Sequence, residues 1–293
     1  MTARAAYKPG ECARLACLLE VTAQKPGNVH PHADFDDVTF QDFVKSANAI
    51  APVMGRAGEL GVGRTVLESI RATREVVSTN TNLGIVLLLA PLVVASPGND
   101  IQTGISSILD ALTVSDADQV YEAIRLARPG GMGEVEEEDV SFRPSRTLLE
   151  VMKLSSERDL VALQYANGFE QVLRIGLPYL EERIKLKDPL DVSIVRLHLN
   201  FLSCCPDTLI ARKCGWDEAE EAALRATSIL THGWPRTEES QQMFYEFDCW
   251  LREDGNRRNP GTTADLVTAV LFVALRKGML KERAIKSLLD REQ

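Results

Sequence analysis

Apolar residues recur at helical spacing along almost the whole chain, and this periodicity limits the fold more than any other feature. In residues 39–54, for example, Phe40, Phe43, Ala47 and Ile50 fall on one face of a helix. We find no convincing pair of alternating strand-like runs, and no Asn-Gly or Asp-Gly turn between two such runs. The sequence therefore predicts an all-α protein.

The same periodicity places the helices and the breaks between them. We expect helices at residues 11–21, 39–54, 62–77, 83–94, 101–112, 117–127, 147–153, 158–165, 168–184, 191–202, 207–213, 217–231, 239–252, 262–277 and 281–289. The longest irregular stretch is 127–146, which would be either a linker or a mobile lid. No other break resembles a domain boundary. We therefore expect residues 1–293 to form a single bundle-like domain with a central nucleotide cleft.

Charge and hydropathy argue against two classes of partner. The formal net charge is -9 and no long basic stretch offsets it, which argues against nucleic acid. The longest apolar run, residues 85–95, is interrupted by Pro91 and is shorter than the roughly 20 residues that span a bilayer. Residues 1–10 lack the apolar core of a signal peptide. We expect a cytoplasmic protein without a membrane partner, with a homodimer as one option for its assembly.

Four short polar segments adjoin the apolar helical runs. They are Lys25-Pro26-Gly27-Asn28 with Asp34 and Asp37, then Asn80-Thr81-Asn82-Leu83-Gly84, then Asp207-Thr208, and finally Asn259-Pro260-Gly261-Thr262-Thr263-Ala264-Asp265. Carboxylate and amide groups beside glycine turns suit a site for a nucleotide and Mg²⁺. The segments lie far apart in the sequence, so only folding can bring them together.

The first segment has two interpretations. Lys25 lies directly before a Pro-Gly turn, where its ammonium could reach a phosphate or simply be solvated. Asp34 and Asp37 could present oxygen ligands to Mg²⁺, or could serve the start of the helix expected at 39–54.

The other three segments each stand at the start of a helix. Asn80, Thr81 and Asn82 could bind phosphate together with free backbone N–H groups, or could cap the helix that follows them. Asp207 has the position of a capping residue. Asp265 would lie in the first turn of the last strongly apolar helix, where it could bind a metal or a ribose hydroxyl, or only complement the helix dipole.

Taken in order, these segments resemble the triphosphoribosyl-dephospho-CoA synthase family. The matching segments are Glu20-Val21-Thr22 with Lys25-Pro26-Gly27, Asp34 with Phe43 and Ser46, Asn80-Thr81-Asn82-Leu83-Gly84, Gly133-Glu134, Gly168-Phe169, Asp207-Thr208, and Pro260-Gly261-Thr262-Thr263-Ala264-Asp265-Leu266. The similarity extends over residues 11–275. Asn82-Leu83 stands where the family has His-Lys, and Leu209 stands where it has Asn, so the chain resembles a divergent branch.

The resemblance implies an all-helical transferase that joins the ribose C1 of ATP to a hydroxyl of 3′-dephospho-CoA and releases adenine, with Mg²⁺ as cofactor. It implies three sets of site residues: catalytic Asp34, Asp207 and Asp265; nucleotide-binding Lys25, Gly27, Asn80, Thr81, Asn82, Gly261, Thr262 and Thr263; and metal-binding Asp34, Asp37 and Asp207. Two alternatives stay open. One is an enzyme of tetrahydromethanopterin-type one-carbon cofactor biosynthesis that uses another small acceptor. The other is a catalytically inactive helical scaffold, which the missing His-Lys pair favours.

Overall fold

The computed structural model describes residues 7–96, 101–130 and 137–290, and the regular structure in these ranges is helical. The one β-feature among them is an isolated bridge between His30 and Ala33. The predicted all-α class is confirmed.

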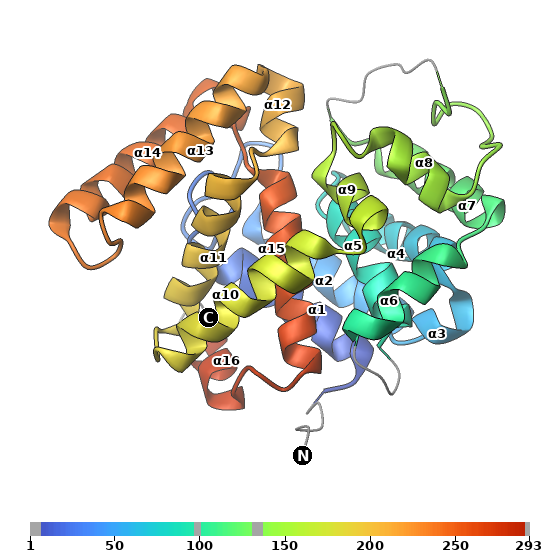
Figure 1. Cartoon of the computed structure of the whole chain (residues 1–293), viewed down its shortest axis with the longest axis horizontal. Coiled ribbons are helices and arrows are strands. Elements are labelled where there is room, and N and C mark those ends of the chain that lie inside the picture. Colours follow the sequence, from blue (N-terminus) through green and yellow to red (C-terminus); the bar gives the residue numbers. More distant parts are fainter. Residues whose placement is uncertain (1–6, 97–100, 131–136, 291–293) are drawn as a thin grey trace.

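The helices follow one another along the chain with short connections (Figure 1). They are α1 (Pro9–Thr22), α2 (Phe40–Met54), α3 (Ala57–Leu60), α4 (Val62–Val76), α5 (Leu83–Val94), α6 (Ile101–Asp110), α7 (Val114–Ala127), α8 (Leu148–Ser155), α9 (Leu160–Asn167), the π-helix Gln171–Gly176, α10 (Leu177–Lys185), α11 (Leu190–Cys204), α12 (Thr208–Cys214), α13 (Trp216–Thr231), α14 (Glu238–Asn256), α15 (Gly261–Arg276) and α16 (Glu282–Leu289).

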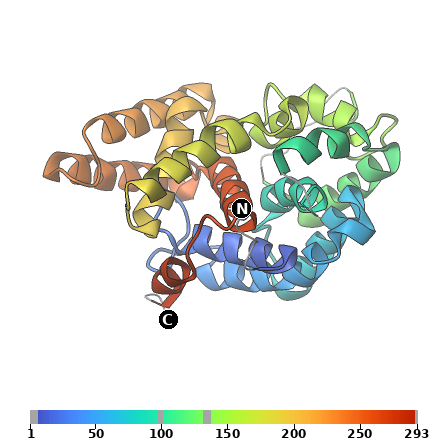
Figure 2. The same cartoon turned by 60° about the horizontal axis from the view of Figure 1, so that its bottom comes forward.

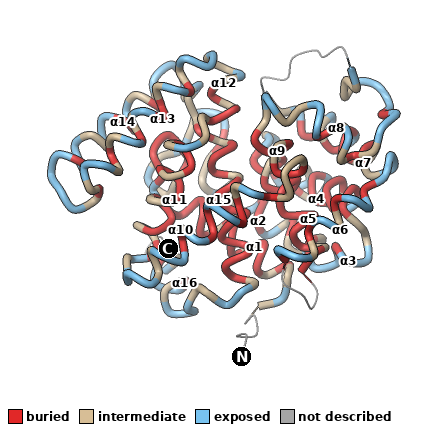
Figure 3. Tube along the Cα trace, in the orientation of Figure 1, coloured by how far each residue is buried: buried red, intermediate tan, exposed pale blue. Residues whose placement is uncertain are grey.

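Two helices, α5 and α15, are apolar on all sides and form the centre of the molecule. Every residue of α15 from Leu266 to Leu275 is buried, and so is every residue of α5 from Ile85 to Val93. A helix without a polar face must be covered by protein all round. Accordingly, α15 packs against α1, α5 and α11, and the buried part of the trace in Figure 3 is concentrated around these helices.

The remaining helices form two groups on either side of α15. In one group α1, α2, α4 and α7 pack in series, and in the other α11 packs against α13, which packs against α12 and α14. Figures 1 and 2 show α15 between the two groups, with the α13–α14 hairpin projecting outward. The N-terminal helix α1 also contacts α16, so the two ends of the chain are joined by packing.

The predicted helix positions are confirmed with small shifts. Each predicted range overlaps a helix of the structure, although the periodicity does not predict α3 and the range 168–184 is divided between the π-helix and α10. The predicted irregular stretch contains no helix at residues 128–130 or 137–146. Gly133-Glu134, part of the family resemblance, lies outside the described residues. Within the described ranges, no helix combines the length and apolar character needed to cross a bilayer. The single-domain organisation stays a prediction.

Candidate active site

A cavity of about 1000 Å³ lies where the central helices begin. Segments from across the chain line it, including Glu20, Asn28, Asp37, Asn80–Ile85, Arg158–Asp159, Arg212–Lys213, Asn259, Gly261–Thr262 and Asp265. Three of the four polar segments noted in the sequence therefore contribute to the wall of the cavity.

The start of α5 forms one side of this cavity and is held rigidly by its own polar residues. The Asn80 carboxamide oxygen accepts a hydrogen bond from the Leu83 N–H (3.1 Å). The hydroxyls of Thr81 and Ser46 are 2.6 Å apart, and the Asn82 side chain donates to the Thr73 hydroxyl (2.9 Å). These bonds fix the first turn of α5, whose backbone N–H groups have no partner within the helix.

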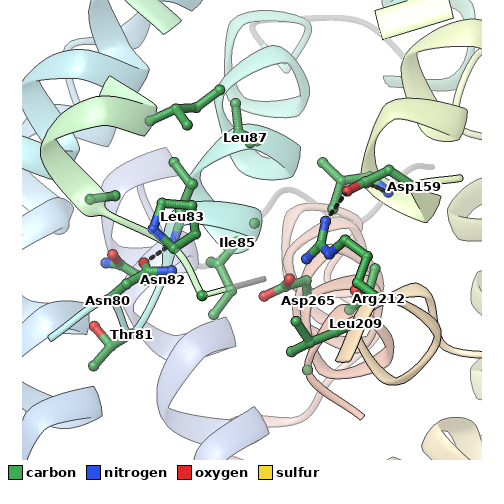
Figure 4. A pocket seen from close by; sticks show the side chains of 18 of the residues that line it. Asn80, Thr81, Asn82, Leu83, Ile85, Leu87, Asp159, Leu209, Arg212 and Asp265 are labelled. Carbon is green, nitrogen blue, oxygen red and sulfur yellow. Dashed lines mark hydrogen bonds and ion pairs between the residues drawn. The ribbon is translucent and has the colours of Figure 1, made fainter. Parts of the chain in front are cut away.

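The start of α15 forms the opposite side and carries Asp265 (Figure 4). A methyl group added to Gly84, in the first turn of α5, would lie 2.0 Å from Asp265 Oδ2. The carboxylate therefore reaches across to the backbone of α5 in a space that only a glycine leaves open.

The surroundings of Asp265 favour its protonated form. Burial raises the pKa of Asp265 well above that of an exposed aspartate, and the negative charges of Glu20, Asp207 and Asp159 raise it further, while Arg212 opposes the rise. No hydrogen bond to the Asp265 carboxylate is found among the described residues. A carboxyl group with these properties can hold a proton for chemistry near neutral pH.

Asp159 and Arg212 form an ion pair on the same wall, as Figure 4 shows. The Arg212 guanidinium donates to Asp159 Oδ2 (2.7 Å), while Asp159 Oδ1 accepts from the N–H groups of Val161 and Ala162 at the start of α9. Both side chains remain partly exposed to the cavity. The pair thus fixes a guanidinium within the reach of an anionic ligand.

Lys25 does not line the cavity, in spite of its place in the first polar segment. Its ammonium is fully buried, lies 2.9 Å from Glu20 Oε1, and donates to the carbonyl oxygens of Glu20 and Ala23. Glu20, near the end of α1, is itself 4% exposed and lines the cavity.

Gly27, Asp34, Asp207 and Thr263 also lie outside the cavity lining. Asp34 is exposed and accepts from the Phe40 N–H (2.7 Å) at the start of α2, and the Gly27 N–H donates to Asp248 (2.7 Å). Asp207 is fully buried and caps α12. Its carboxylate accepts from two N–H groups of α12 and from the N–H and hydroxyl of Thr263, which ties α12 to α15.

Comparison with known proteins identifies the family. The family model of ATP:dephospho-CoA triphosphoribosyl transferase matches residues 6–283. The chain belongs to this family. A crystal structure of a candidate triphosphoribosyl-dephospho-CoA synthase from Archaeoglobus fulgidus is similar over 80% of this chain and 98% of that chain, with 27% sequence identity and a TM-score of 0.63. No curated protein matches the chain. The predicted family and the predicted class of transferase are confirmed.

Among the described residues, the carboxylates on the wall of this triphosphoribosyl transferase cavity do not form a preassembled metal site. No cluster of three or more His, Cys, Asp or Glu side chains suited to a metal occurs in the described part of the chain. Of the three predicted metal ligands, Asp37 lines the cavity, whereas Asp34 and Asp207 do not. Mg²⁺ bound to a nucleotide takes most of its ligands from phosphates and water and needs only one or two carboxylates. The cavity fits an ion brought in by the nucleotide better than a resident one.

Sequence reasoning did not assign three residues that this transferase brings to the cavity: Glu20, Asp159 and Arg212. Two signals existed. Glu20 is an acidic residue that directly follows the apolar run 15–19 in the predicted first helix, and Asp159 directly precedes α9. The pairing of Asp159 with Arg212, 53 residues away, left no signal in the local pattern.

Proposed function

We propose that the protein transfers the triphosphoribosyl group of ATP to a hydroxyl of 3′-dephospho-CoA and releases adenine. The observation that carries this proposal is the single cavity in which the first turns of α5 and α15 face each other with Asp265 between them. The two proposed substrates, ATP and dephospho-CoA, are those in the description of the family.

The triphosphate is assigned to the helix starts. The first turn of α5, with Asn80 and Thr81, and the N–H group of Thr262 in α15 are the proposed donors, because a helix N-terminus attracts negative charge. The N–H groups of Gly261 and Thr263 already donate to Asn259 and Asp207. Arg212 adds a guanidinium on the same wall. Mg²⁺ bound to the triphosphate would neutralise part of its charge, and Asp37 is the predicted metal ligand that lines the cavity and could bind that ion.

The ribose is assigned to the neighbourhood of Asp265. Breaking the bond between ribose and adenine develops positive charge on the ribose, and nearby carboxylates stabilise that charge electrostatically. Glu20 and Asp159 line this part of the wall with Asp265, and the negative charges of Glu20 and Asp159 lower the electrostatic cost of a cation there. Asp34 and Asp207 are assigned structural roles instead, at the starts of α2 and α12.

Adenine release tests the proposal directly. The purified protein is incubated with ATP and Mg²⁺, with and without dephospho-CoA, and free adenine is measured by chromatography while mass spectrometry follows the acceptor. We expect adenine and triphosphoribosylated dephospho-CoA in equal amounts, and only when both substrates are present. AMP in place of ATP is the matched control, because it keeps the same glycosidic bond but lacks the terminal phosphates. Absence of adenine with ATP and dephospho-CoA would overturn the proposal.

A further inference from the structure

The buried pair formed by Glu20 and Lys25 has no part in the function proposed so far. Glu20 lies in the last turn of α1 and Lys25 just beyond the end of this helix, which packs directly against α15. Glu20 is 4% exposed and lines the cavity, whereas Lys25 is completely buried behind it. Burying a charged pair is costly, so its position beside a reaction cavity calls for an explanation.

Lys25 uses all its hydrogen-bonding capacity on its own segment. An ammonium has three N–H donors. Here they meet Glu20 Oε1 at 2.9 Å, the Glu20 carbonyl and the Ala23 carbonyl at 3.1 Å. No donor is left for a phosphate. Lys25 therefore satisfies carbonyl groups at the end of α1 and supplies the counter-charge of Glu20.

Asp265 is another carboxyl group of this part of the cavity, and it differs from Glu20 in the charges that surround it. Burial raises the pKa of Glu20, but the adjacent Lys25 opposes the rise. Burial raises the pKa of Asp265 well above its ordinary value, and the neighbouring negative charges add to the rise. Arg212, whose charge opposes this rise, is already paired with Asp159. Two carboxyl groups in such different environments can divide the roles of acid and base between them.

We propose that Glu20 is the general base that takes the proton of the acceptor hydroxyl, that Asp265 is the general acid that protonates the departing adenine, and that Lys25 is the positioning residue of Glu20. This inference rests on the proposed function. The bond between ribose C1 and adenine breaks with its electron pair on adenine, which receives the Asp265 proton. The acceptor oxygen bonds to C1 and gives its proton to Glu20. Transfer of that proton from Glu20 to Asp265, across the cavity that both line, restores the starting state.

The first test separates acid from base. In Glu20→Gln, the side chain keeps an oxygen that can accept from Lys25. We expect both Glu20→Gln and Asp265→Asn to lower the rate of adenine release by about 10²–10⁴-fold, with the Kd for ATP changed less than threefold. Glu75→Gln, on the exposed face of α4 and outside the cavity, is the control and retains the wild-type rate.

A substrate with a better leaving group then distinguishes the two variants. In 4-nitrophenyl riboside 5′-triphosphate the leaving group departs as an anion and needs no proton. With this substrate, the rate of Asp265→Asn should rise toward that of the wild type, whereas the rate of Glu20→Gln should stay low. If the wild type releases adenine but Glu20→Gln remains within threefold of it, this inference is overturned while the proposed function stands. If the nitrophenyl substrate restored the rate of Glu20→Gln and left Asp265→Asn slow, the inference would also be overturned.

The second test concerns Lys25. Removing its charge in Lys25→Met raises the pKa of Glu20, so the acid limb of the profile of kcat/KM against pH moves to higher pH. The double variant Glu20→Gln/Lys25→Met removes both charges together and should recover the Tm that Lys25→Met loses, but not the rate of adenine release. Recovery of both would assign the pair a purely structural role and overturn the inference. An unshifted acid limb in folded Lys25→Met would overturn it as well.

Discussion

The replacement Asp207→Asn should destabilise the fold without impairing the chemistry. Asp207 Oδ1 accepts from the N–H groups of Leu209 (2.8 Å) and Ile210 (3.1 Å), and Oδ2 accepts from the Thr263 N–H (2.7 Å) and the Thr263 hydroxyl (2.8 Å). An asparagine keeps one acceptor oxygen. Its NH₂ group must then face either the Thr263 N–H or the two N–H groups of α12, so at least one buried donor loses its partner.

The size of the effect follows from these bonds. A hydrogen bond to a charged acceptor contributes about 1.5–3 kcal/mol, and leaving a buried donor unpaired costs the upper part of that range. We therefore expect Asp207→Asn to lower the free energy of unfolding by about 3 kcal/mol. The entropy of unfolding is about 2.1 cal/mol/K per residue, or about 0.6 kcal/mol/K for a chain of 293 residues. Because the shift in Tm is the loss of stability divided by this entropy, the Tm should fall by about 5 °C.

Thermal unfolding followed by circular dichroism at pH 7 measures the change, and adenine release at 25 °C measures the activity of the folded fraction. Asp34→Asn is the matched control, because the Asp34 carboxylate is exposed and accepts one bond, from the Phe40 N–H. We expect its Tm to stay within about 1 °C of the wild type. An unchanged Tm in Asp207→Asn, together with a hundredfold loss of adenine release, would refute the structural role and return Asp207 to the chemistry.

Three further outcomes are expected. Gly84→Ala places a methyl group 2.0 Å from Asp265 Oδ2 and should lose about 1–3 kcal/mol of stability together with most adenine release, whereas Gly58→Ala, with no atom within 4 Å of the added methyl, should lose neither. Because the pKa of Asp265 is raised in the folded state, its favourable contribution is present below the pKa of the unfolded chain and is lost as the pH rises through the folded pKa. Chemical denaturation should therefore show Asp265→Asn gaining stability relative to the wild type with rising pH, by up to about 1.4 kcal/mol per pH unit, and a constant difference would contradict the raised pKa. Arg212→Gln should raise the KM for ATP about tenfold, corresponding to about 1.4 kcal/mol, with little change in kcat, and steady-state kinetics that show an unchanged KM would remove Arg212 from the phosphate site.

The sequence predicts the centre of this fold well because the relevant signal is local. The runs that become α5 and α15 are apolar on nearly all sides, so burial of both helices follows from their composition. The polar residues directly before each run must then lie where a buried helix begins, and the starts of buried helices need partners for their N–H groups. For this reason the local pattern is enough to place Asn80 and Gly261 beside a cavity.

The local sequence does not predict which partner a polar side chain contacts. Lys25 before a Pro-Gly turn fits a phosphate ligand or a solvated lysine equally well, and the structure uses it for neither, since its ammonium is buried against Glu20 and the end of α1. Asp207 after Pro206 likewise fits a metal ligand or a helix cap. The choice depends on Thr263, which is 56 residues away and approaches only after α12 and α15 have packed.

The mixed charge of the cavity agrees with a reaction that involves both an anion and a developing cation. A site that only binds a triphosphate would gain from helix starts and guanidinium groups alone, and carboxylates would weaken its binding. Here the carboxylates of Glu20 and Asp159 lie on the wall together with the helix starts and Arg212. Such carboxylates are unfavourable for the bound substrate but favourable once the ribose becomes positive, which is the differential stabilisation that lowers a barrier. The arrangement is therefore better suited to cleavage at the ribose than to transfer of a phosphate, where charge develops on the oxygens instead.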